Sequence, residues 1–121
     1  MKNNLILLLF ALLFFPVTLF SQDNNFELKA SQSMLMTGKG EGQDGAKNPF
    51  YGQDCYAIVK NIGTKKFSIR IQLKGKILKT IPILKGEIKK IKLLKDQELY
   101  LDSNSKSKIK ASLDFKEIKD R

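Results

Sequence analysis

The stretch FSIRIQL, residues 67–73, decides the fold class of this chain, because apolar and polar side chains alternate along it without a break. Successive side chains of a β-strand point to opposite faces, so the pattern predicts a strand with one buried and one solvated face. The stretch from Phe26 to Met36 alternates in the same way apart from Gln32, and the stretch from Ile109 to Phe115 alternates throughout. We therefore expect a strand in each of the three stretches.

Four further apolar runs complete the pattern, and they cover residues 55–60, 77–84, 88–94 and 98–101. Turn-forming residues separate the runs at intervals of 8 to 12 residues. This spacing is typical of antiparallel sandwiches and barrels rather than of strands that alternate with helices. The sequence predicts an all-β fold, a small antiparallel β-sandwich of the immunoglobulin-like kind with about seven strands.

Two of these runs leave room for alternatives. Pro82 has no amide hydrogen, so the run 77–84 is expected at a sheet edge or broken by a bulge. Residues 86–95 also fit one apolar face of a short helix. We favour a strand there, because a two-turn helix would have to pack within a series of short hairpins. The polar residues 116–121 are expected to fray.

The N-terminus has the layout of a secretory signal peptide over residues 1–21. Lys2 gives a positive start, Leu5 to Phe15 is uninterruptedly apolar, and Ser21 supplies a small residue before the expected cut. An uncleaved anchor is the alternative, although Leu5 to Phe20 is 16 residues long against the roughly 20 that a span needs. Cleavage leaves residues 22–121 as one domain without a stable membrane span, exported to the periplasm or the extracellular space.

A resemblance supports this location. The segment Leu19-Phe20-Ser21-Gln22, followed by an Asn-, Lys- and Ile-rich chain, resembles the uncharacterised small exported β-rich proteins of Bacteroidetes-type bacteria. The resemblance covers the signal segment and the composition only. It implies an envelope or extracellular location and carries over no functional residues.

Composition excludes several chemistries. The chain has no His and a single Cys, so Cys/His zinc sites, Ser-His-Asp triads and internal disulfides are ruled out. Cys55 opens an apolar run and is expected to be buried, with intermolecular pairing as the alternative. We predict neither a cofactor nor an enzymatic activity. A glycosidase-like pair of Asp54 with Glu41 or Asp44 remains a competing hypothesis.

A long Gly-rich loop over residues 37–53 holds five of the eight glycines. Loops of this length tend to be functional or disordered. Residues 40–45 match the dinucleotide-binding spacing G-x-G-x-x-G, but a β run follows them instead of the helix that the motif requires. Glu41, Asp44 and Asp54 could supply oxygen ligands to calcium, but the sequence around them lacks the EF-hand pattern. We therefore interpret these carboxylates as solvated.

Phe50 and Tyr51 form an aromatic pair near the end of this loop. They are candidate contacts for a glycan or a protein partner. The alternative, which we favour, is that both side chains fold back over the core.

The charge is strongly uneven. The whole chain carries +10, and residues 55–95 hold twelve basic residues against the single acid Glu87. Such a block attracts anionic polymers. The candidate contacts are Lys74, Lys76, Lys85, Lys89, Lys90 and Lys92. The competing interpretation is ordinary solvation of strand faces and edges, because nearly all the basic residues are Lys, whereas specific phosphate recognition favours Arg.

These observations predict an exported, non-enzymatic binding or structural module of the bacterial envelope or extracellular space. Its expected partner is an envelope or extracellular protein. The alternative is a polyanion-binding protein that recognises lipopolysaccharide, anionic polysaccharide or extracellular nucleic acid through a Lys-rich face.

Overall fold

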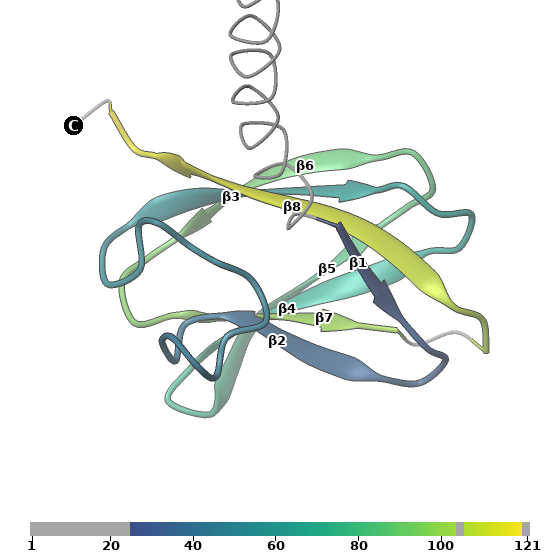
Figure 1. Cartoon of the computed structure of the whole chain (residues 1–121), viewed down its shortest axis with the longest axis horizontal. Coiled ribbons are helices and arrows are strands. Elements are labelled where there is room, and N and C mark those ends of the chain that lie inside the picture. The colour runs from purple at the N-terminus through teal and green to yellow at the C-terminus, as the bar shows by residue number, and fades with distance from the viewer. Residues whose placement is uncertain (1–24, 104–105, 120–121) are drawn as a thin grey trace, which may run out of the picture.

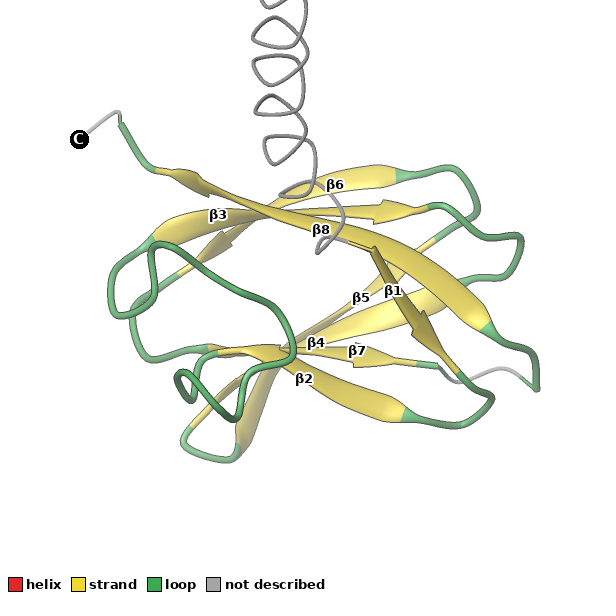
Figure 2. Cartoon of the chain, viewed as in Figure 1, coloured by secondary structure: helices red, strands yellow, loops and turns green. Residues whose placement is uncertain are grey.

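The computed structural model describes residues 25–103 and 106–119, and the regular structure within them consists of β-strands (Figures 1 and 2). The strands are β1 (Asn25–Leu28), β2 (Ser33–Thr37), β3 (Cys55–Asn61), β4 (Phe67–Leu73), β5 (Lys76–Ile83), β6 (Ile88–Leu93), β7 (Glu98–Asp102) and β8 (Ile109–Glu117). The residues that the structure describes include no helix with the length and hydropathy of a membrane span. The expected signal peptide, residues 1–21, lies outside them.

The strands form two antiparallel sheets of four, in the orders β1-β8-β3-β6 and β2-β7-β4-β5. Figure 1 shows the sheets as two layers facing each other, with the loop between β2 and β3 at one end. The predicted all-β sandwich is thus confirmed.

The strand order is that of a jelly roll. The pairs β1–β8, β2–β7, β3–β6 and β4–β5 are those of one long hairpin folded over into two layers, with its tip between β4 and β5. A jelly roll has eight strands in two Greek keys, whereas a constant-type immunoglobulin sandwich has seven strands divided four and three. The part of the chain that the structure describes has eight strands where about seven were expected, and its strand order corrects the immunoglobulin-like order.

The eighth strand comes from the stretch 26–36, which we expected to form one strand. It forms β1 and β2, which belong to different sheets. The chain turns the corner at Ser31, whose φ is 58°, and the neighbouring Ala30 is exposed. No glycine marks the corner, and the apolar parity resumes after it, so the interruption at Gln32 is the only sign of the break in the pattern.

The turn between β4 and β5, at the tip of the long hairpin, has the backbone conformation of a tight two-residue β-turn. Leu73 pairs with Lys76, so the connection is two residues long, and both of them, Lys74 and Gly75, have positive φ. Two residues with positive φ form the turn whose twist matches that of the flanking strands.

Three local expectations can now be checked. Pro82 lies on β5, which is an edge strand with a register shift opposite Ile71 and Gln72, as predicted. Residues 88–93 form strand β6 and not a helix. The tail prediction was wrong in part, because β8 continues to Glu117 beside β3 and Ile118 is buried.

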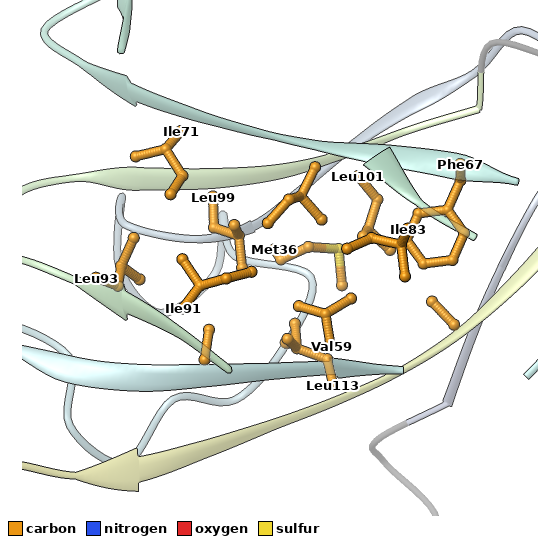
Figure 3. Packing of buried hydrophobic residues seen from close by; sticks show 14 of the residues in the cluster. Met36, Val59, Phe67, Ile71, Ile83, Ile91, Leu93, Leu99, Leu101 and Leu113 are labelled. Carbon is orange, nitrogen blue, oxygen red and sulfur yellow. The ribbon is translucent and has the colours of Figure 1, made fainter. Parts of the chain in front are cut away.

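The core lies between the layers (Figure 3). One sheet contributes buried side chains that include Val59, Ile91, Leu93 and Leu113. The other contributes a set that includes Met36, Phe67, Ile71, Ile83, Leu99 and Leu101. All of them come from alternate strand positions, which explains why period-two patterning identified most of the core.

Candidate functional site

The Gly-rich loop between β2 and β3 is held by the carboxylate of Asp44. Its two oxygens accept hydrogen bonds from the amides of Gly38 (3.1 Å), Lys39 (2.9 Å) and Gly40 (3.1 Å) and from the hydroxyl of Thr37 (3.2 Å). Charged acceptors form the stronger hydrogen bonds of proteins. Asp44 is therefore a structural residue of the loop, and its oxygens are already committed.

The same loop covers the free edge of β2. The amides of Gly45 and Ala46 donate to the carbonyls of Leu35 and Met36, both at 2.9 Å. An uncovered edge strand would offer these carbonyls to another chain. The long loop thus protects the edge of β2, a role that its glycine content alone did not indicate.

The two aromatic residues of the loop separate. Phe50 packs against the core, and its amide donates to Oδ1 of Asn48 at 2.9 Å. Tyr51 is 53 % exposed and lines a hollow of about 620 Å³ together with Pro49, Ala46 and Glu41. Phe50 is half-buried and lines a different hollow beside Tyr56 and Lys90, so the two rings face different parts of the surface.

Cys55 is fully buried and free. Burial raises the pKa of its thiol, the negative charge of Asp54 raises it further, and a weak hydrogen bond from Asn48 acts in the opposite direction. A raised pKa keeps the sulfur protonated and unreactive.

Asp54, which follows the Gly-rich loop, is also engaged, because it accepts a hydrogen bond from the amide of Lys95 at 2.7 Å. Among residues 25–103 and 106–119, no group of three or more His, Cys, Asp or Glu side chains is arranged to hold a metal ion.

The clearest candidate surface is the outer face of the sheet β1-β8-β3-β6. The strand registers bring five exposed lysines onto it, and we call them the lysine face: Lys60, Lys90, Lys92, Lys110 and Lys116. The outward acids of the same four strands are Glu27 and Asp114. Cations therefore exceed anions by three on this face.

Two contacts shape the lysine face. The ammonium of Lys90 lies 4.2 Å from the centre of the Tyr56 ring, in the geometry of a cation–π contact. Glu27 forms ion pairs with Lys108 (3.4 Å) and Lys110 (3.9 Å) at the β1 side. Glu27 thus offsets positive charge at the β1 side, and Asp114 of β8 lies beside Ile58 of β3.

The six lysines proposed from the sequence do not form one surface. Lys90 and Lys92 lie on the lysine face, whereas Lys89 points to the opposite side of β6 and forms a long ion pair with Glu87 (4.0 Å). Lys74 and Lys76 lie at the β4–β5 turn of the other sheet, and Lys85 lies in the β5–β6 turn. Sequence reasoning missed Lys60, Lys110 and Lys116, which the pairing of β3 with β6 and β8 brings onto the same sheet face as Lys90.

The outer face of the other sheet carries a compact polar network. Arg70 of β4 binds both carboxylate oxygens of Asp102 on β7, at 2.8 and 2.9 Å, and also donates to Gln72. Its guanidinium stacks 4.3 Å from the centre of the Tyr100 ring. Ser33 of β2 donates to Asp102 at 2.6 Å, so the network joins three strands.

The network lowers the pKa of Asp102. The hydrogen bonds from Arg70 are the main cause, the one from Ser33 adds to them, and partial burial opposes them. A signal for this cluster existed in the sequence, because Arg70 is an outward arginine in a chain whose other strand cations are lysines. Arg matches a carboxylate with two parallel hydrogen bonds, which Lys cannot do.

Comparison with known proteins found no matching family model, no matching curated protein and no matching solved structure.

Proposed function

We propose that this protein is an exported, non-enzymatic binding module of the bacterial envelope or extracellular space, and that it binds anionic polymers through the lysine face. The observation that carries the proposal is the convergence of lysines from β3, β6 and β8 on one outer sheet face with two carboxylates among them. The export rests on the signal-like segment at residues 1–21.

Charge and shape favour a repeating anion over a single small ligand. The lysine face is an exterior sheet surface on which the ammonium groups of Lys60, Lys92 and Lys116 come from different strands. A lysine ammonium group is a point charge on a flexible side chain and lacks the rigid two-pronged donor geometry of an arginine guanidinium. Such groups suit a row of closely spaced sulfates or phosphates better than one anion held in a defined orientation. Tyr56 adds a flat apolar element under Lys90.

The non-enzymatic part of the proposal rests on how the polar groups are used. Asp44 holds loop amides, Asp54 accepts from the Lys95 amide and Asp102 pairs with Arg70. The Cys55 thiol is buried with a raised pKa. These side chains have structural partners, so none of them is poised as a nucleophile or a general base.

The test is binding to heparin as a function of salt, with Lys60, Lys90 and Lys116 replaced together by Gln. Each neutralised contact releases counterions, so the logarithm of affinity should fall linearly with the logarithm of salt. We expect the triple variant to bind about tenfold or more weakly at low salt, with a slope smaller by about 2.

The matched control replaces Lys39, Lys47 and Lys66, which lie in loops away from the lysine face, by Gln. It changes net charge by the same amount. Equal losses in the two triple variants would show that heparin follows overall charge, and unchanged binding in the face variant would refute the proposed surface.

A further inference from the structure

A second surface lies at the open side of the sandwich, where the edge strands of the two sheets meet. β5 ends one sheet and β6 ends the other. Between them lies a hollow of about 200 Å³, which is lined by Ile71, Leu78, Lys79, Lys92, Leu94 and Gln97. Ile71 is a core residue, so the hollow reaches from the surface to the packed interior.

A bulge in β5 builds this hollow. Gln72 pairs with Ile77 and Ile71 pairs with Lys79, which leaves Leu78 as the extra residue. Consecutive strand side chains normally point to opposite faces, yet both Leu78 and Lys79 line the hollow. Bulges commonly re-aim side chains in this way.

The lining combines an apolar wall with positive charge. Leu78 and Leu94 are each 43 % exposed, so the apolar wall is open to a ligand. The two lysines are exposed, and none of the six lining residues is acidic. Asp96 lies in the adjacent β6–β7 turn without lining the hollow.

We infer that this hollow binds a single-chain anionic amphiphile, such as a fatty acid, with the acyl chain against Ile71, Leu78 and Leu94 and the anionic head at Lys79 and Lys92. Charge complementarity and the aliphatic lining select this class over a neutral or cationic ligand. A hollow of this size accommodates part of one chain, so a free single-chain molecule suits it better than a bilayer surface. The hollow shares Lys92 with the lysine face, so variants that leave Lys92 in place are used to tell the two proposals apart.

The experiment is a calorimetric titration of the purified protein with dodecanoate, kept below the concentration at which dodecanoate forms micelles. It measures the dissociation constant and the number of molecules bound per protein. We expect saturable binding with one molecule per protein, and weaker binding of dodecyltrimethylammonium, which has the same chain and the opposite charge. Leu78→Gln removes part of the apolar wall and should weaken dodecanoate binding about tenfold. Lys79→Gln should weaken it about threefold and reduce its salt dependence.

Ile77→Gln is the matched control, because Ile77 precedes Leu78 on β5, is 56 % exposed and does not line the hollow. It should leave dodecanoate binding unchanged. The inference fails if no saturable binding occurs, if Ile77→Gln weakens binding as much as Leu78→Gln, or if the cationic amphiphile binds equally well. Binding to anionic phospholipid vesicles without binding to dodecanoate would also overturn it.

These outcomes are separable from those for the lysine face. Lys79 takes no part in that face, and Lys60, Lys90 and Lys116 do not line the hollow. A protein that binds heparin but not dodecanoate would retain the proposed function and lose this second site.

Discussion

Gly38 constrains the point at which the Gly-rich loop leaves β2. Its φ is 127°, and a Cβ there would lie 2.6 Å from the carbonyl oxygen of Gln97 and 2.7 Å from the Cα of Glu98. Both neighbours are backbone atoms, which cannot turn aside as a flexible side chain would. Only glycine permits this close approach between the start of the loop and the β6–β7 turn.

Gly38→Ala should therefore destabilise the protein by about 3 kcal/mol or more, because backbone strain and overpacking add. Gly42→Ala is the control, since Gly42 also has positive φ (93°) but open space around it, and it should cost about 1–2 kcal/mol. Urea denaturation of both variants measures the difference. Equal losses would show that the close approach to Gln97 contributes nothing.

Some residue-level properties followed from the sequence and others did not. The apolar run that begins at Cys55 correctly indicated its burial. The role of Asp44 was hidden, because its partners are backbone amides that only the folded loop brings around it. The separation of Phe50 from Tyr51 depends likewise on the path of the loop over the core, which adjacency in sequence does not specify.

Among the strands, the contact between Arg70 on β4 and Asp102 on β7 is the strongest polar link. The pair is mostly buried, with exposed fractions of 22 % and 14 %, and its two hydrogen bonds are bidentate. Since the folded-state pKa of Asp102 is lowered, the pair contributes its full stability above the pKa of the unfolded carboxyl, 3.8. That contribution is lost as pH falls through the folded pKa.

We predict that the wild-type protein loses stability from this pair, up to about 2 kcal/mol, as pH falls below 3.8 and through the lowered folded pKa of Asp102, in addition to other acid effects. Asp102→Asn should be less stable at pH 6 and should show a correspondingly smaller loss on acidification. Urea denaturation at a series of pH values measures both. A variant that loses as much stability on acidification as the wild type would contradict the assigned partner.

Strand assignment from alternation succeeded where a strand has one buried face, as in β4 and β8. It failed at Ser31, because the same apolar parity resumes after the corner between the sheets and the single interruption at Gln32 did not reveal it. The search for a basic segment also grouped Lys89 with Lys90, although neighbouring residues of β6 must face opposite sides. Counting charge along the chain located the basic segment. The alternation of side chains between the two faces of each strand decides which of its lysines share a face.

At the scale of the whole molecule, the two outer faces differ in charge. The lysine face has five cations against Glu27 and Asp114, whereas the outer face of the other sheet sets Arg70 against Glu98 and Asp102. Such asymmetry orients a protein as it approaches a polyanion, because one face is attracted and the other is not.

This asymmetry was beyond prediction from the sequence. The residues Lys60, Lys90 and Lys116 lie far apart in the chain and share one sheet face because β3 pairs with both β6 and β8. The pairing follows from the jelly-roll order, in which strands distant in sequence adjoin. An immunoglobulin-like order would have placed different lysines together.

The most direct test of the lysine face is a two-dimensional NMR titration of the isotopically labelled protein with a heparin oligosaccharide. The account predicts that amide shifts concentrate on outward residues of β3, β6 and β8, with Tyr56 and Lys90 among the largest, while Arg70 and Tyr100 on the other sheet stay unchanged. Shifts centred on β4 and β7, or spread evenly over lysines throughout the chain, would contradict it.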